Sequence, residues 1–158
     1  MKPLSYLVFA VSLLAILLAN TVLANSVDEV IAYKEAPPGV VFEIVSNRPD
    51  LLKKLLPTLR NDIKRLRGRF PGLPIAIVTH GSEQFSLTKK QSSKYSDVHN
   101  TVEKMVVDDN IDVHVCGTYA EWYGITPEDF PAYVDVAPEG PAQINNYTDL
   151  DYVLITLP

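Results

Sequence analysis

Three short runs rich in β-branched and apolar residues, at 40–45, 75–79 and 111–115, constrain the possible folds of this chain most strongly. Each run has the composition of a buried strand. Between the first two runs, apolar residues recur every three or four positions from Leu52 to Phe70, which predicts one amphipathic helix. Strands separated by helices pair in parallel, because each crossover helix returns the chain to the same edge of the sheet. The pattern therefore predicts a single α/β domain.

The rest of the chain continues this alternation. We expect a shorter helix around 98–106, a fourth strand at 134–136, a last helix within 140–149 and a closing strand at 152–156. Short helical segments should begin near Thr118 and at Thr126, where Pro127 suits a first helical position. Two features predict the course of the first long helix. Residues 46–47 can cap it, and Pro57 should kink or restart it because proline lacks a backbone N–H.

Residues 1–24 have the pattern of an export signal. A short positive start is followed by an apolar run, and Ala24 supplies the small residue expected at a cleavage site. We expect cleavage after Ala24 and a periplasmic or secreted protein. The alternative is an uncleaved membrane anchor, since the stretch through Ala24 is just long enough to span a bilayer. After the signal we expect an N-terminal arm at 25–39 and the folded domain at 40–158.

Charge is distributed unevenly along the chain. The formal net charge of −5 argues against a general nucleic-acid-binding protein. Eight basic residues lie between Arg48 and Arg69, whereas twelve acidic residues and one basic residue follow from Asp97 onward. One interpretation is a solvated basic helix face with solvated acidic loops. The other is that the opposite charges pair between subunits or with a partner.

Cys116 is the only cysteine, and it stands where a predicted strand passes into a predicted helix. Gly117 allows a tight turn at this junction, and the N–H groups of the following helix would favour a thiolate. A single cysteine cannot form an internal disulfide. The thiol is therefore either buried and inert or present to react.

Three polar segments should meet at one edge of the sheet, because ligands of open α/β sheets bind beyond the carboxyl ends of the strands. These segments are 46–47, 80–82 and 116–118. They supply catalytic candidates and ligand-binding candidates. The catalytic candidates are Cys116 and His80, and the ligand-binding candidates are Asn47, Gly81, Gly117 and Thr118. His80 would hold the thiol as a thiolate or relay its proton, the alternative being a histidine bonded to local backbone.

The other histidines carry weaker signals. His114 shares the strand face of Asp112 and Cys116, where a satisfied core group is the alternative to a direct role. His99 falls on the polar face of its predicted helix. One cysteine with scattered histidines does not supply a metal site, and the glycines form no phosphate-binding loop. We therefore expect neither a metal nor a cofactor.

The chain resembles the DsrE/DsrF-like proteins of sulfur trafficking over 40–158. The resemblance rests on the order of the segments 77–81 (IVTHG), 113–117 (VHVCG) and 134–140 (VDVAPEG), with strands at 40–45 and near the C-terminus. It implies a three-layer α/β/α sandwich with a mainly parallel five-stranded sheet, assembled as homotrimers or hexamers. It also implies that Cys116 accepts sulfur as a persulfide and passes it on. The export signal and Pro57 depart from the family pattern.

These observations predict an exported sulfur carrier or sulfurtransferase-like protein that relays sulfane sulfur on Cys116. Its partner would be a thiol protein or a small sulfur compound, and it would contact a membrane only if the signal is uncleaved. The alternative is a non-catalytic, oligomeric binding or scaffold module of the same fold. In that case Cys116 would be structural, and the uneven charge would carry the function.

Overall fold

A parallel five-stranded sheet forms the centre of the protein. The structure is a computed structural model, and it describes residues 25–157. The strands are β1 (Val40–Ile44), β2 (Ile75–Thr79), β3 (Asp112–Cys116), β4 (Asp135–Ala137) and β5 (Val153–Leu157). Their order is β4-β3-β2-β1-β5, and every neighbouring pair is parallel. The predicted α/β fold with a parallel five-stranded sheet is therefore confirmed.

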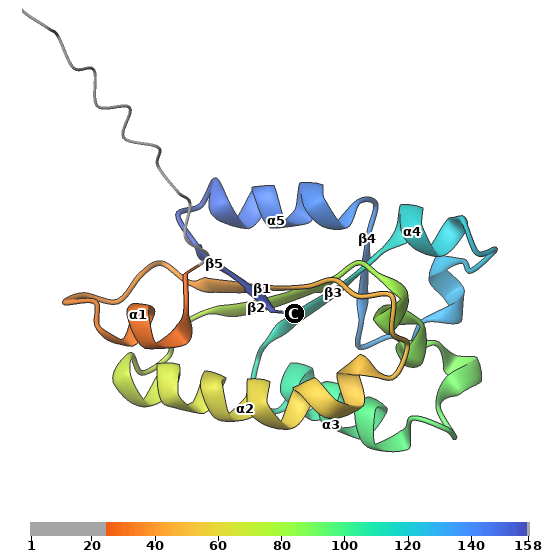
Figure 1. The fold of residues 1–158 in the computed structure, drawn as a ribbon, viewed down its shortest axis with the longest axis horizontal. Coiled ribbons are helices and arrows are strands. Elements are labelled where there is room, and N and C mark those ends of the chain that lie inside the picture. Colours follow the sequence, from red (N-terminus) through yellow and green to blue (C-terminus); the bar gives the residue numbers. More distant parts are fainter. Residues whose placement is uncertain (1–24, 158) are drawn as a thin grey trace, which may run out of the picture.

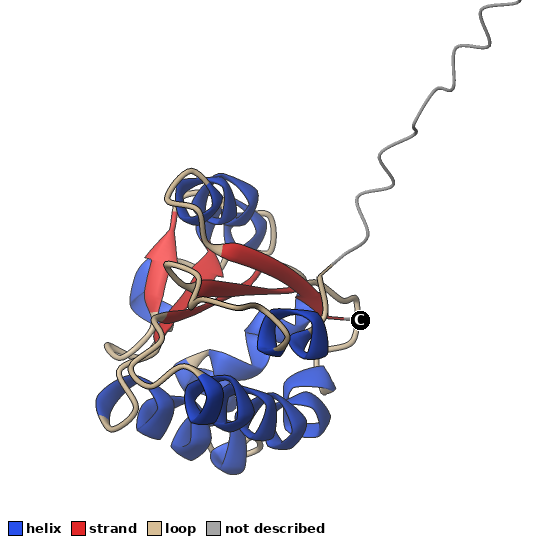
Figure 2. Ribbon diagram, turned by 90° about the vertical axis from the view of Figure 1, so that its left-hand side faces the viewer, coloured by secondary structure: helices blue, strands red, loops and turns tan. Residues whose placement is uncertain are grey.

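Helices cover both faces of this sheet. One face carries α1 (Val27–Ile31), α2 (Leu51–Arg69) and α3 (Ser96–Val107), and the other carries α5 (Gly140–Thr148), as Figures 1 and 2 show. The larger hydrophobic core fills the space beneath α2 and α3. The smaller core beneath α5 is built from Val41, Ala76, Val78 and Ile144. The molecule is thus a three-layer sandwich with unequal cores.

The long helix α2 is uninterrupted even though Pro57 lies inside it. Of the kink or restart expected at this proline, the restart does not occur. An apolar stripe along α2 is buried against the sheet, and this burial offsets the hydrogen bond that proline cannot donate. The stripe consists of Leu51, Leu52, Leu56, Leu59, Ile63 and Leu66.

The N-terminal side of the fold differs from expectation in two places. Residues 25–39, predicted as an arm, contain α1, which begins with a capping box between Ser26 and Glu29 and buries Val27 and Val30. Helix α2 begins after Asp50, so the predicted cap at residues 46–47 is wrong. The Ser46 hydroxyl instead accepts a hydrogen bond from the Arg48 N–H at 3.2 Å.

Shorter helices connect the remaining elements. They are the 3-10 helices η1 (Ser82–Leu87), η2 (Lys89–Gln91) and η3 (Pro127–Asp129), together with the α-helix α4 (Gly117–Glu121). The helical segment expected to begin at Thr126 is present as η3, and a capping box joins Thr126 to Asp129. The expectation that His99 lies on a polar face is wrong. Its Nε2 lies 3.0 Å from the Ser86 carbonyl, and its Nδ1 lies 2.7 Å from the Tyr133 hydroxyl in the interior.

A buried carboxylate fastens together the segments that follow β1 and β2. Glu83 in η1 is fully buried. Its Oε1 accepts hydrogen bonds from the Thr79 hydroxyl at 2.6 Å and the Gly81 N–H at 2.9 Å, and its Oε2 accepts the Ser46 N–H at 2.7 Å. Three donors compensate the loss of hydration that burial imposes on this group. Glu83 therefore fixes two neighbouring strand ends to each other.

A second polar cluster joins α5 to the sheet. The Tyr147 hydroxyl on α5 donates to Asp112 Oδ2 at 3.3 Å and lies 2.8 Å from Nε2 of His114 on β3. Burial lowers the pKa of His114, and the carboxylates of Asp135 and Asp112 partly oppose this effect. Burial also raises the pKa of Tyr147. The cluster confirms that His114 and Asp112 share the face of β3 that α5 covers.

Glu83→Gln should destabilise the fold strongly. The amide offers one acceptor oxygen and turns an NH₂ group toward backbone and hydroxyl donors, so we expect a loss of about 3 kcal/mol in the free energy of unfolding. Chemical denaturation measures this change, with the exposed Glu35→Gln as a matched control. A loss as small as that of the control would contradict the fastening role.

Stability should fall as the pH drops below about 6.5. The folded-state pKa of His114 lies below the ordinary value of 6.5, so the unfolded chain binds the proton first. Neutral His114 therefore contributes its full share of stability above its unfolded-state pKa. This share decreases as the pH falls from that value toward the lower pKa of the folded state. His114→Gln should reduce this pH dependence, whereas Tyr147→Phe should leave the histidine's titration in place. Denaturation midpoints measured across this pH range test it, and an unchanged slope in His114→Gln would refute it.

Candidate functional site

The thiol lies at the predicted junction between strand and helix. Cys116 is the last residue of β3 and the N-cap of α4, and its Sγ accepts a hydrogen bond from the Tyr119 N–H at 3.4 Å. The residue is only 5% exposed. Because α4 has five residues, its dipole is small, and the contact to the sulfur is one weak hydrogen bond.

A buried amide fixes the backbone of Cys116. The side chain of Gln84 in η1 donates from Nε2 to the Cys116 carbonyl at 3.2 Å and accepts the Cys116 N–H on Oε1 at 2.7 Å. This paired contact sets the direction of the thiol. The sequence reasoning did not single out Gln84 or its neighbour Glu83. The one available signal was a pair of long polar residues directly after a predicted strand end.

His80 pairs with a carboxylate that the sequence reasoning also missed. Its Nε2 lies 2.9 Å from Glu43 Oε1, and Glu43 Oε2 accepts the Thr156 hydroxyl at 2.8 Å. The side chains of His80 and Glu43 are 14% and 21% exposed. Because a carboxylate accepts hydrogen bonds, Nε2 carries the hydrogen and Nδ1 of neutral His80 is left as an acceptor. The available signal was a single charged residue in the otherwise apolar run of β1.

Gly140, the first residue of α5, lies against both candidate catalytic residues. A Cβ at this position would be 2.5 Å from Cβ of His80 and 3.3 Å from Cβ of Cys116. The structure therefore brings the two residues to one edge of the sheet, beneath the start of α5. Among residues 25–157, no hydrogen bond joins the sulfur to His80, whose imidazole is paired with Glu43.

The ligand-binding candidates lie at the same edge, in different settings. A side chain at Gly81 would run into the backbone of Ser46, so packing requires glycine there. The Thr118 N–H and hydroxyl both donate to the Pro138 carbonyl, at 3.0 and 2.9 Å. Gly117 lies against the end of β4, and Asn47 is exposed. These contacts give Gly81 and Thr118 structural roles, and ligand binding at all four positions stays a prediction.

Aromatic side chains border the helix that Cys116 caps. Tyr119 stacks on Phe85 with ring centroids 5.6 Å apart, and its hydroxyl lies 2.9 Å from the Ser82 hydroxyl. Trp122 and Tyr123 extend this cluster outward and are 74% and 60% exposed. Exposed aromatic residues are typical of contact surfaces.

Within residues 25–157, no group of three or more histidine, cysteine, aspartate or glutamate side chains could hold a metal ion. No helix in that range is both long and apolar enough to cross a membrane. The predicted export signal at 1–24 lies outside the described residues, so export and cleavage stay predictions.

Comparison with known proteins identifies a shared fold. Neither a protein-family model nor a curated protein matches the sequence. The protein of unknown function MTH1491 from Methanobacterium thermoautotrophicum has a similar structure, with a TM-score of 0.59 and 19% identity over 75% of this chain and 97% of that one. The YchN protein of E. coli gives a TM-score of 0.54 and 15% identity over 75% of this chain and 99% of its own. At such identities the likeness shows the α/β fold alone.

Proposed function

We propose that this protein is an exported sulfur carrier or sulfurtransferase-like protein that holds sulfane sulfur as a persulfide on Cys116. The observation that carries the proposal is the placement of the single thiol. The thiol caps α4 at the carboxyl edge of a parallel sheet, and the hydrogen-bonded pair of His80 and Glu43 lies beside it. The resemblance to sulfur-trafficking proteins supplies the type of reaction. As in that family, we include homotrimeric or hexameric assembly in the proposal.

The proposed reaction is a pair of sulfur transfers without a net redox change. The Cys116 thiolate attacks the terminal sulfane sulfur of an inorganic polysulfide. A bond from Sγ to that sulfur forms, the adjacent S–S bond breaks, and the shortened polysulfide leaves with the bonding electron pair. A thiolate of a partner protein then attacks the outer sulfur, and Cys116 leaves as a thiolate. Each step moves one sulfane sulfur atom and transfers no net electrons, so the proposal requires no cofactor.

The neighbouring groups have separate roles in this proposal. The Tyr119 N–H stabilises negative charge on Sγ before and after transfer. His80 accepts the thiol proton on Nδ1, because its other nitrogen donates to Glu43. Thr156 holds the second oxygen of Glu43 and so orients the pair.

Burial of the thiol limits the substrate. With Cys116 only 5% exposed, the approach to the sulfur must be narrow. A linear polysulfide, one sulfur atom wide, suits this approach better than a bulky disulfide. Gly140 contributes by leaving the space between His80 and Cys116 free of a side chain.

The same burial supports a second candidate, a non-catalytic oligomeric binding or scaffold module. Unpaired cysteine is among the residue types most often buried for packing alone. In this case the exposed Trp122 and Tyr123 would form the contact surface, and the thiol would resist modification in the folded protein.

Incubation with inorganic polysulfide should load the wild-type protein. Intact-mass spectrometry should show a gain of one or more sulfur atoms that a small thiol reductant removes, and Cys116→Ser should gain none. If the wild type gains no sulfur and its thiol is alkylated only after denaturation, the carrier proposal fails and the scaffold candidate stands.

His80→Gln and Glu43→Gln should slow the loading of sulfur by about ten-fold or more. The first removes the group that accepts the thiol proton, and the second removes the carboxylate that orients this group. Thermal melting should show that both variants stay folded, and Glu35→Gln serves as the control for loss of an exposed carboxylate. Loading rates are followed by mass spectrometry at several pH values. Unchanged rates in His80→Gln would remove the histidine from the mechanism while leaving the persulfide intact.

A further inference from the structure

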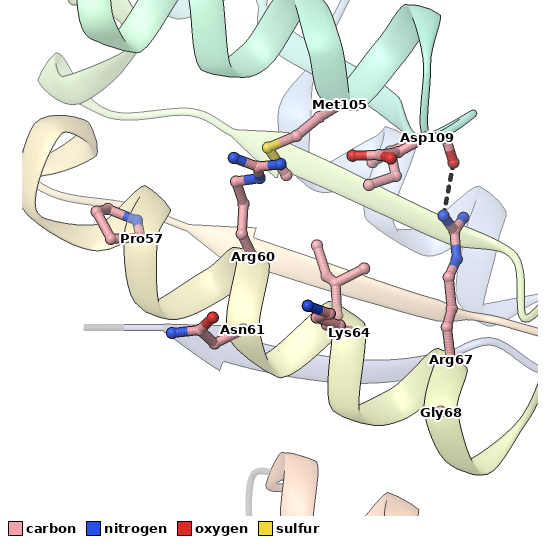
Figure 3. A pocket seen from close by; sticks show the side chains of 10 residues that line it. Pro57, Arg60, Asn61, Lys64, Arg67, Gly68, Met105 and Asp109 are labelled. Carbon is pink, nitrogen blue, oxygen red and sulfur yellow. Dashed lines mark hydrogen bonds between the residues drawn. The ribbon is translucent and has the colours of Figure 1, made fainter.

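A basic groove lies between α2 and α3, at the end of β3 opposite to the thiol. It has a volume of about 800 Å³, and Arg60, Lys64 and Arg67 of α2 line one side of it. Met105 of α3 and the nearby Asp109 lie on the other side, as Figure 3 shows, together with Ile111 in the segment 109–111. That segment precedes β3, whereas Cys116 ends β3. The groove is therefore separate from the candidate site described above.

Positive charge in this groove is not neutralised by ion pairs. The Arg67 guanidinium donates to the carbonyls of Leu73 and Asp109, at 3.1 and 2.6 Å, and these acceptors carry no net charge. Arg60 and Lys64 are exposed and form no ion pair with any residue in 25–157. The Asp109 carboxylate also lines the groove and partly opposes the three cations. Because Arg67 is engaged by backbone carbonyls, Arg60 and Lys64 are the cations most available to an anion.

Two residues that weaken helices line the same groove. Pro57 lies in the interior of α2 and Gly68 is its penultimate residue, and proline and glycine are the residue types with the lowest helix propensity. Gly68 has no structural need to be glycine, because a Cβ there would meet nothing within 4 Å and its φ is not positive. Departures from local preference without a packing gain are typical of functional sites. The absent side chain keeps the wall of the groove open.

We propose that this groove binds a small polyanion bearing carboxylate or phosphate groups. With a rise of 1.5 Å per residue, positions 60, 64 and 67 spread three cations over about 10 Å along one helix face. Arginine guanidinium groups match the planar geometry of carboxylate and phosphate oxygens. Ile63 and Met105 are almost fully buried, so the aliphatic stems of the arginine and lysine side chains supply most of the apolar contact.

Isothermal titration calorimetry of the purified protein with citrate and with inorganic tripolyphosphate tests this proposal. Binding of one or both anions at low ionic strength is expected, and the stronger one identifies the preferred group. Arg60→Gln and Lys64→Gln should each weaken binding by about three- to five-fold, as loss of an exposed charge pair predicts. Asp109→Asn should strengthen binding, because it removes the opposing charge.

Three more variants separate binding in the groove from other effects. Gly68→Leu improves helix propensity but fills the opening, so it should weaken binding by at least about five-fold without lowering the melting temperature. Lys53→Gln changes an exposed charge on α2 outside the groove and should leave affinity unchanged. Cys116→Ser should also bind normally, which keeps this result distinct from the sulfur-carrier proposal. Absence of binding by both anions, or equal weakening by Lys53→Gln and Lys64→Gln, would overturn the proposal.

Discussion

The buried carboxylate of Glu83 is the contact on which the candidate site depends. It ties the end of β2 to the segment after β1 through Thr79, Gly81 and Ser46. The next residue, Gln84, holds the backbone at the end of β3 through two hydrogen bonds to Cys116. Two consecutive buried side chains thus join three strand ends. Without them the sheet edge that carries His80 and the thiol would have no fixed geometry, because loops alone do not hold side chains in place.

The two ends of β3 carry different chemistry. At its carboxyl end, Cys116 is held between η1, α4 and the start of α5, beside an oriented histidine. At its amino end, the basic groove is formed by α2 and α3 and uses none of these groups. The thiol is buried, whereas the groove is open and charged. Sulfur transfer at the carboxyl end of β3 and anion binding at its amino end would therefore use different residues and be chemically independent.

Patterns that depend on neighbours along the chain were predicted well. The strands at 40–44 and 75–79 and the apolar stripe of α2 follow from local composition and period. The behaviour of Pro57 was not predictable, because burial of the stripe against the sheet outweighs one missing hydrogen bond. The prediction that His99 lies on a polar helix face was wrong for a similar reason. Its hydrogen-bond partner Tyr133 lies 34 positions away in the chain and does not belong to the same helix.

The sequence by itself determined the parallel α/β alternation and the position of the single thiol at a strand-to-helix junction. Both depend on residues adjacent in the chain. Only the tertiary structure decided that His80 pairs with Glu43, which in turn binds Thr156 at a separation of 113 positions. It likewise decided that Gly140 lies against both His80 and Cys116. Such contacts depend on which strands become neighbours and on which helix covers them, and no local period in the sequence records that arrangement.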